Sequence, residues 1–185
     1  MIFDIYQAVF IGEAIVHVEI RKAGLDDREI LANLLEKYDY EFSQYDKRGV
    51  NKLGLFGYPY LDFYWTDDDR WAYLIYADNE LAGFIMVFNY REERSRETDF
   101  QIAEFFVIYK YRRSGVGKQA FFQVLDKHRG RWGLGTHPEN ITAMTFWENS
   151  IDEYTKGQYE KCSSYPKAAY PDGSPVNLFY FDNSK

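Results

Sequence analysis

Apolar and polar residues succeed one another along the chain at spacings that predict both strands and helices. Residues 15–22 alternate as a strand does, and residues 25–42 repeat apolar side chains at helical spacing. The apolar stripe of that helix is expected to comprise Ile30, Leu31, Leu34, Leu35 and Tyr38. Residues 43–69 are harder to assign, because the run GLFGYPYLDFYW contains Pro59 and two glycines and is typical of an irregular loop.

A hairpin is the clearest element in the middle of the chain. Within residues 70–90, two apolar and aromatic runs flank the polar turn Asp78-Asn79-Glu80, which is the composition that a tight turn requires. The charged stretch 91–99 is expected to be a solvated loop, and a further strand is expected at 100–108.

The second half of the chain continues the alternation of helices and strands. The expected elements are a helix at 115–128, a strand at 131–136, a helix at 138–154 and strands at 157–163 and 176–182. The order β, α, β, β, β, α, β, α, β, β predicts one mixed α/β domain over residues 15–185. Residues 1–14 are an N-terminal extension whose role the pattern does not indicate.

Composition and charge narrow the classes of function. The chain has 185 residues, enough for one domain with a sizeable core, and its net charge of −7 argues against nucleic-acid binding through a basic surface. The single Cys162 cannot form an internal disulfide, which fits a reducing cytoplasm. Asp4 and Glu13 interrupt the apolar N-terminus, so no signal peptide is expected. No run of 18 apolar residues occurs, so no membrane span is expected, and neither Cys162 nor any two histidines have metal-ligand spacing.

The stretch FFVIYKYRRSGVGKQAFF, residues 105–122, joins an expected strand to an expected helix through a basic, glycine-containing junction. Backbone amides at a helix N-terminus attract anions, and glycines allow an anion to approach closely. With the side chains of Arg112, Arg113 and Lys118 nearby, the junction suits a pyrophosphate group. The alternative is that Gly115 and Gly117 only permit a tight turn. The residues after Gly117 fit neither a P-loop nor a Rossmann fingerprint.

The pattern Arg112-x-x-Gly115-x-Gly117 resembles the R/Q-x-x-G-x-G/A loop of the GNAT (Gcn5-related N-acetyltransferase) superfamily. EFFVIYKYRRSGVGKQAF is similar to the fourth strand and third helix of that family, and ENITAMTFW to a later helix, with Asn140 and Ala143 matching. The resemblance covers about residues 16–182. It implies the GNAT fold, a mixed central sheet flanked by helices, and acetyl-CoA as the co-substrate.

The resemblance also implies the residues that contact the cofactor. The pantetheine arm would contact Phe106, Val107 and Ile108 of the strand, together with Asn140 and Phe146 of the later helix. The pyrophosphate would be bound by Arg112 and by the backbone amides of Arg113, Ser114, Gly115, Val116, Gly117 and Lys118. One position departs from the family. Trp147 stands where a Tyr often protonates the departing thiolate, and an indole N–H has negligible acidity.

Transfer of an acetyl group to an amine requires a base, and Glu104 is the first candidate because it interrupts an apolar strand just before the junction. The alternative is a solvent-facing charge on a half-exposed strand. His137 is the second candidate. The wall for the acceptor amine is expected from Tyr58, Tyr60, Asp62 and Tyr64, since aromatic faces and carboxylates suit a cation, although packing beside a solvated acidic turn explains them equally well.

These residues predict an N-acetyltransferase that acts on a primary amine of a small molecule or peptide by direct attack in a ternary complex. The alternative is a catalytically silent CoA-binding module with a regulatory or interaction role, which Trp147 favours. No metal, nucleic acid or membrane is expected to take part, and a homodimer is left open.

Overall fold

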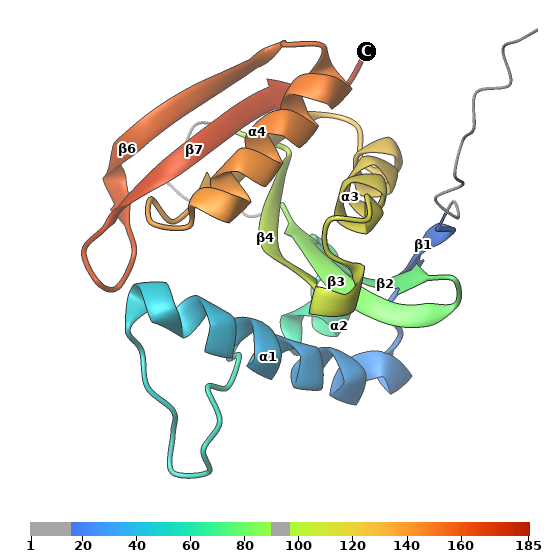
Figure 1. The fold of residues 1–185 in the computed structure, drawn as a ribbon, viewed down its shortest axis with the longest axis vertical. Coiled ribbons are helices and arrows are strands. Elements are labelled where there is room, and N and C mark those ends of the chain that lie inside the picture. The colour runs from blue at the N-terminus through green and yellow to red at the C-terminus, as the bar shows by residue number, and fades with distance from the viewer. Residues whose placement is uncertain (1–15, 90–96) are drawn as a thin grey trace, which may run out of the picture.

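Residues 16–89 and 97–185, described by the computed structural model, form one seven-stranded sheet with helices on both faces (Figure 1). The strands are β1 (Val18–Lys22), β2 (Arg70–Ala77), β3 (Glu80–Phe88), β4 (Phe100–Val107), β5 (Arg131–Thr136), β6 (Tyr159–Ala169) and β7 (Pro175–Asp182). The helices are η1 (Leu25–Asp27), α1 (Arg28–Asp46), α2 (Phe63–Thr66), η2 (Tyr109–Tyr111), α3 (Val116–Lys127) and α4 (Ile141–Thr155). The N-terminal extension and residues 90–96 of the charged stretch lie outside the described residues.

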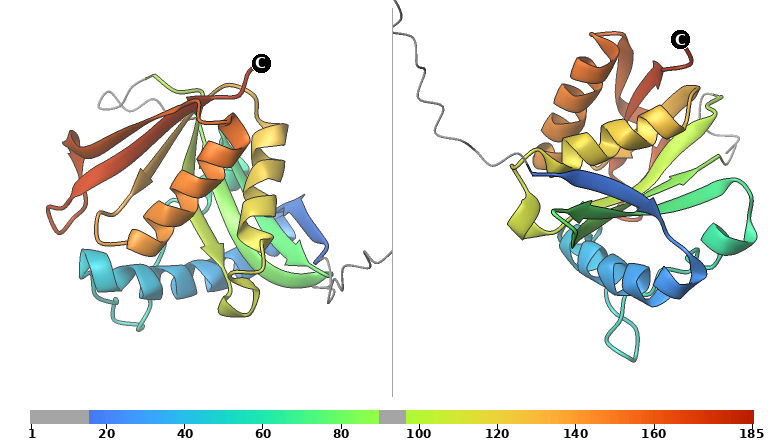
Figure 2. Two further views of the ribbon diagram at one scale, coloured as in Figure 1. Left: turned by 45° about the horizontal axis from the view of Figure 1, so that its top comes forward. Right: turned by 90° about the vertical axis from the view of Figure 1, so that its right-hand side faces the viewer.

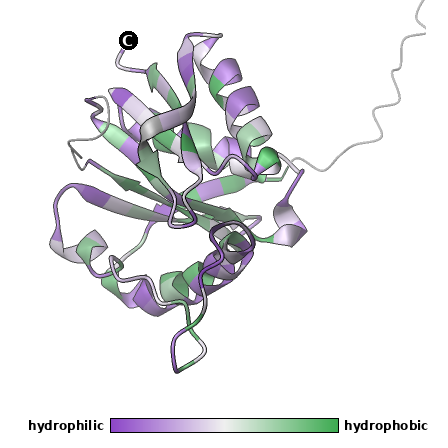
Figure 3. Cartoon of the chain, turned by 90° about the vertical axis from the view of Figure 1, so that its left-hand side faces the viewer, coloured by the Kyte–Doolittle hydropathy of each residue, from purple (hydrophilic) through white to green (hydrophobic). Residues whose placement is uncertain are grey.

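The sheet has the order β1-β2-β3-β4-β5-β7-β6. All neighbouring strands are antiparallel except β4 and β5, which are parallel and are connected through α3. This arrangement confirms the expected mixed α/β class and the expected order of elements. In Figure 3 the central strands are coloured mostly hydrophobic, whereas α1 mixes both colours, as a helix with one buried face should.

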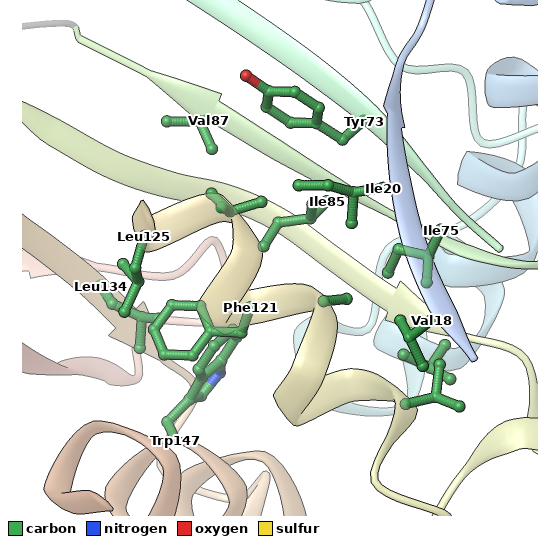
Figure 4. Packing of buried hydrophobic residues seen from close by; sticks show 14 of the residues in the cluster. Val18, Ile20, Tyr73, Ile75, Ile85, Val87, Phe121, Leu125, Leu134 and Trp147 are labelled. Atoms are coloured by element: carbon green, nitrogen blue, oxygen red, sulfur yellow. The ribbon is translucent and has the colours of Figure 1, made fainter. Parts of the chain in front are cut away.

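The two faces of the sheet bury separate cores. On one face, Leu31, Leu34 and Leu35 of α1 pack against Leu74 and Phe84 of the sheet. On the other face, α3 and α4 cover a second cluster, part of which Figure 4 shows. Figure 2 shows α1 on one side of the sheet and α3 with α4 on the other. The glycine junction leads from this sheet into α3, and Glu104 lies within the sheet itself, between the two helical layers.

Several expectations from the pattern need correction. Ile30 is 37% exposed, because it lies in the first turn of α1 at the edge of the buried stripe. The region 43–69 is irregular only in its middle, since α1 continues to Asp46 and α2 forms a single turn. The helix expected at 138–154 begins at Ile141, because Asn140 caps it. The hairpin is confirmed, with Asp78 and its neighbour both at positive φ.

β4 and β5 separate beyond a short paired stretch, and the term opening denotes the gap between their two backbones. Their pairing covers only Phe100–Ile102 and Trp132–Leu134. Beyond these residues β4 runs on to Val107, and Figures 1 and 2 show β4 diverging from the β6–β7 hairpin while α1 crosses below. A bulge in β4 lies at the point of divergence, where Glu104 pairs with Met86 and Ile102 pairs with the next residue of β3. A bulge of this kind bends the strand and redirects its side chains.

Candidate active site

The turn between β4 and α3 presents a row of backbone amides. The chain leaves β4 through η2 and reaches Gly115, the N-cap of α3. Gln119 is the first residue whose amide bonds back into this turn, to the Gly115 carbonyl oxygen at 3.0 Å. The amides that precede it face the N-terminal end of α3, where the helix dipole favours an anion. A helix N-terminus of this kind can hold an anion, and the pyrophosphate site at residues 113–118 stays a prediction.

The two glycines of the junction have different structural roles. Gly115 has φ of +81°, in the left-handed region that glycine adopts without steric cost. Gly117 lies within α3, and a Cβ atom there would come within 3.3 Å of the Phe105 ring and 3.4 Å of the Phe146 ring. The missing side chain of Gly117 therefore lets α3 pack closely on β4 and α4. Both glycines therefore have a structural role in the fold.

Two basic side chains of the junction are paired within the fold. Arg112 donates to both carboxylate oxygens of Glu41 on α1, at 2.8 and 2.9 Å. Lys118 donates to both carboxylate oxygens of Glu153 on α4, at 2.9 Å. Arg113 is exposed. The positive potential at the junction therefore comes mainly from the amides, the helix dipole and Arg113, while Arg112 fastens the junction to α1.

One edge of β4 faces the opening. The amide of Ile108 donates to the Ala82 carbonyl oxygen of β3 at 2.8 Å, so the backbone groups of the preceding Val107 point away from β3. The Val107 carbonyl oxygen accepts a hydrogen bond from Arg112 Nε at 2.6 Å, and Phe106 is buried with the α1 core. Of the three residues expected to pair with a pantetheine arm, Val107 is the one whose amide faces the opening.

The first turns of α4 hold Asn140 and Phe146. The side-chain oxygen of Asn140 accepts a hydrogen bond from the Ala143 amide at 3.0 Å, which caps the helix. Its NH2 group retains donors for a ligand. Phe146 stacks on Phe105 of β4, with ring centroids 5.4 Å apart and planes 10° apart. This stack joins α4 to the strand that carries Glu104.

Trp147 is a core residue. It is 5% exposed and packs against Phe105 and Phe121 with centroid distances of 5.0 Å, and Figure 4 shows its ring beside Phe121. The indole N–H is not acidic, so this position supplies no proton to a departing thiolate. Another group or a water molecule has to supply it.

Glu104 is partly buried on the α1 side of β4. Burial raises the pKa of Glu104 to about 7, and the Asp39 carboxylate adds to the rise, whereas the hydroxyl groups of Tyr38 and Tyr58 and the Arg48 guanidinium oppose it. A carboxylate with a pKa near the ambient pH is well suited to general-base catalysis, because it is partly ionised and still basic.

Four tyrosines surround Glu104 and come from three segments. Tyr38 belongs to α1, Tyr58 and Tyr64 to the segment around α2, and Tyr170 to the turn between β6 and β7. Burial, and then the charge of Glu104, raise the pKa of each of these hydroxyls, so the rings stay neutral. Neutral aromatic rings beside a carboxylate form an environment that suits a cationic amine.

Two other residues expected in the acceptor wall lie away from this cluster. Tyr60 is 53% exposed and touches the rings of Tyr58 and Phe63. Asp62 pairs with Arg28 on the surface at 2.6 Å. The structure thus brings Tyr58 and Tyr64 to Glu104 and leaves Tyr60 and Asp62 at the surface.

A buried charge cluster beside Glu104 was missed by the sequence pattern. Asp39 and Asp46 of α1 are 1% and 7% exposed, and Arg48 binds both carboxylates. Burial raises the pKa of Asp39 to about 6, although the Arg48 guanidinium opposes the rise. Two aspartates seven residues apart on the apolar face of a helix, followed by an arginine, were the local signal for this cluster. Tyr170 gave no local signal.

His137 is buried in the turn between β5 and α4. Its Nδ1 accepts a hydrogen bond from the Glu139 amide at 3.2 Å, and its Nε2 lies 3.3 Å from Asp172 Oδ2. An amide can only donate, so Nδ1 is unprotonated and Nε2 carries the ring proton. Both nitrogens are therefore engaged within the fold. The ring is also 4.7 Å from that of Tyr170, measured between centroids.

Within residues 16–89 and 97–185, no cluster of three or more His, Cys, Asp or Glu side chains is arranged to hold a metal ion. In the same two ranges, no helix is both long enough and apolar enough to cross a membrane. The polar groups that the structure does gather are those around Glu104 and the amides at the N-terminus of α3.

Comparison with known proteins identifies the family. Residues 34–151 match the family model described as the acetyltransferase (GNAT) family. No curated protein matches the sequence. The matched residues run from α1 into α4 and include Glu104, the glycine junction and Asn140.

Solved structures share the fold at low sequence identity. A GNAT-family acetyltransferase from Streptococcus agalactiae 2603 is 19% identical, with a TM-score of 0.61 over 91% of this chain and 96% of the other. The spermidine N-acetyltransferase from Vibrio cholerae, in complex with CoA and spermine, is 13% identical, with a TM-score of 0.60 over 91% and 96%. AAC(6')-Iy, in complex with the bisubstrate analogue CoA-S-monomethyl-acetylneamine, is 16% identical, with a TM-score of 0.50 over 72% and 89%. Sequence and fold agree, and the chain belongs to the GNAT family of acetyltransferases.

Proposed function

We propose that this protein is an N-acetyltransferase that transfers the acetyl group of acetyl-CoA to a primary amine of a small molecule or peptide. The observation that carries the proposal is the position of Glu104, beside the opening between β4 and β5, with its pKa raised to about 7 by burial. The complex of the Vibrio cholerae spermidine enzyme with CoA and spermine supports both a CoA co-substrate and a cationic acceptor.

The cofactor is bound mainly by the main chain. The amides of residues 113–118 hold the pyrophosphate at the N-terminus of α3. The Val107 amide, which faces the opening, pairs with the pantetheine arm as an added strand would, and the free NH2 group of Asn140 donates to the same arm. The thioester then lies in the opening, with the acceptor approaching from the α1 side where Glu104 points.

The reaction requires a neutral amine, because an ammonium has no lone pair. Glu104 takes a proton from the amine, directly or through one water molecule, and the nitrogen then attacks the thioester carbonyl carbon. A C–N bond forms and the C–S bond breaks. The nitrogen, which becomes cationic on attack, loses a second proton to water. The sulfur leaves as a thiolate, which is a tolerable leaving group because the thiol pKa is about 8.5, and it gains a proton from water.

The acceptor is cationic before it loses its proton. Glu104, Asp39 and Asp46 place three carboxyl groups in this region, of which Asp39 and Asp46 are paired with the guanidinium of Arg48. The tyrosine rings around Glu104 add faces that attract a cation. An anionic acceptor would meet unfavourable charge here, so amines with further positive charge are preferred.

The test is a panel of cationic amines offered with acetyl-CoA, followed by release of free thiol. Turnover with any amine supports the enzyme, and Glu104→Gln should then lower kcat by about 10²–10⁴-fold, the usual contribution of a general base. Glu19→Gln provides the matched control, because Glu19 is an exposed carboxylate of β1 paired with Arg21. Near-native kcat for Glu104→Gln on a verified substrate would show that Glu104 is not the catalytic base.

A silent CoA-binding module is the second candidate, and the burial of Trp147 is the observation that favours it. A buried indole at this position leaves the thiolate without a dedicated acid. Tight binding of CoA without turnover across the amine panel would support this second function and overturn the first.

A further inference from the structure

His137 lies where three segments of the fold meet. Its side chain is 0% exposed. The ring stacks on Tyr45 near the end of α1, with centroids 5.4 Å apart, and contacts Tyr170 of the β6–β7 turn, with centroids 4.7 Å apart. Its backbone belongs to the turn that leads from β5 into α4. The side chain of His137 therefore contacts Tyr170, one of the tyrosines around Glu104, while its backbone leads to Asn140, the N-cap of α4.

On the cofactor side, His137 shapes the turn that begins α4. Its Nδ1 accepts a hydrogen bond from the Glu139 amide at 3.2 Å, and its carbonyl oxygen accepts one from the Asn140 amide at 3.0 Å. These two bonds fix the turn from which Asn140 caps α4 and presents its NH2 group. The placement of Asn140 toward CoA therefore depends on Nδ1 of His137.

On the acceptor side, the Nε2–H of His137 points at Asp172 Oδ2, at 3.3 Å. Asp172 organises the β6–β7 turn, because its carboxylate accepts hydrogen bonds from the amide of Ser174 at 3.0 Å and from its hydroxyl at 2.7 Å. Tyr170 belongs to the same turn and lies close enough for the charge of Glu104 to raise its pKa. Through Asp172 and its own ring, His137 therefore holds Tyr170 against the acceptor site.

We propose that His137 is a positioning residue that serves both substrate sites, with Nδ1 setting the turn that places Asn140 and Nε2 setting the turn that places Tyr170. The acceptor half of this assignment rests on the proposed acetyltransferase function. The ring takes no substrate proton, since both nitrogens are engaged within the fold. Loss of the Nε2 contact should weaken binding of the amine alone, whereas loss of both bonds should weaken binding of the amine and of CoA.

Two substitutions of His137 separate the bonds. In His137→Asn, the side-chain oxygen takes the place of Nδ1 and accepts the Glu139 amide, but nothing reaches Asp172. We expect its CoA dissociation constant to stay within about twofold of the wild-type value and its KM for the amine to rise roughly tenfold, as for one lost hydrogen bond. In His137→Ala, both bonds are lost, and we expect CoA affinity to fall roughly tenfold as well.

Asp172→Ala tests the same tether from the surface, without disturbing the buried ring. It should raise the amine KM as His137→Asn does and leave CoA affinity unchanged. The double variant His137→Asn/Asp172→Ala should have the same amine KM as Asp172→Ala alone, because Asp172→Ala already removes the tether together with the two bonds from Ser174. Additive losses in KM would show that the two residues act separately and would overturn the tether.

Hydrogen exchange supplies a readout that does not depend on activity. In both His137→Asn and Asp172→Ala, the amides of residues 170–174 should exchange faster, while those of α4 keep their wild-type protection. If the wild type shows no turnover with any amine, the proposed function fails, but the exchange and CoA measurements still decide the role of His137. Unchanged exchange in the turn, or equal loss of CoA and amine binding in His137→Asn, would overturn the proposal.

Discussion

Glu104 should make the stability of this protein depend on pH in a way that Glu104→Gln removes. Burial raises its pKa from 4.5 in the unfolded chain to about 7 in the folded protein. A group whose pKa is raised on folding stabilises the fold only while it is protonated in both states. Its contribution is therefore complete below about pH 4.5 and is lost as the pH rises through 7.

The magnitude follows from the two pKa values. A rise from 4.5 to about 7 corresponds to about 3 kcal/mol between the acid and alkaline limits. Glu104 is only partly buried, and solvent reduces this figure, so we expect about 2 kcal/mol between about pH 5 and pH 8. Glu104→Gln keeps the shape of the side chain and cannot ionise. The variant should gain this amount of stability relative to the wild type over that range of pH.

Urea unfolding of both proteins at several pH values measures the difference, with the midpoint and the slope fitted together. Glu19→Gln is the control, because Glu19 is exposed on β1 and its pKa is lowered by the hydrogen bond from Arg21, so it should show no gain at higher pH. A stability difference between Glu104→Gln and the wild type that is constant from pH 5 to pH 8 would refute the reasoning, because Glu104 would then be an ordinary solvated carboxylate.

Three further substitutions test other parts of the site. Asp39→Asn removes a charge that raises the pKa of Glu104, so the acidic limb of the pH–rate profile should move to lower pH. An unchanged limb would show that Asp39 does not influence the titration of Glu104. Ser114→Glu places a carboxylate among the junction amides and should weaken CoA binding at least tenfold in a calorimetric titration, while the uncharged Ser114→Gln should not. Trp147→Ala should cost about 3–5 kcal/mol in urea unfolding, as expected for a core aromatic residue; a loss below 1 kcal/mol would contradict its place in the core.

Features that depend on neighbouring residues were predictable from the sequence. The β2–β3 hairpin follows from two apolar runs and the Asp78-Asn79 turn, whose φ angles of 49° and 65° are those that such turns require. The glycine junction follows from a strand, a basic stretch and a helix in direct succession. Glu104 could be singled out because a charge in an apolar strand is conspicuous within a few residues of sequence.

The surroundings of Glu104 could not be predicted in the same way, because they come from segments far apart in the chain. Tyr38 has the spacing of a core residue, and only the fold shows that its hydroxyl reaches Glu104. Tyr170 lies in a turn near the end of the chain and comes close to Glu104 only because the β6–β7 hairpin folds back over α1. His137 was singled out from the sequence, whereas the contact of its Nε2 depends on Asp172, a partner 35 residues away.

The short pairing between β4 and β5 has a mechanical consequence. Only three residues of each strand are in register, so beyond Ile102 no ladder of backbone hydrogen bonds holds the two halves of the sheet at a fixed separation. The stack of Phe146 on Phe105 and the contacts of α4 are what span the gap instead. The separation of the two halves of the sheet beyond Ile102 is therefore set by side-chain packing, and a change in ring size at Phe105 or Phe146 should alter it without altering the pairing of any strand.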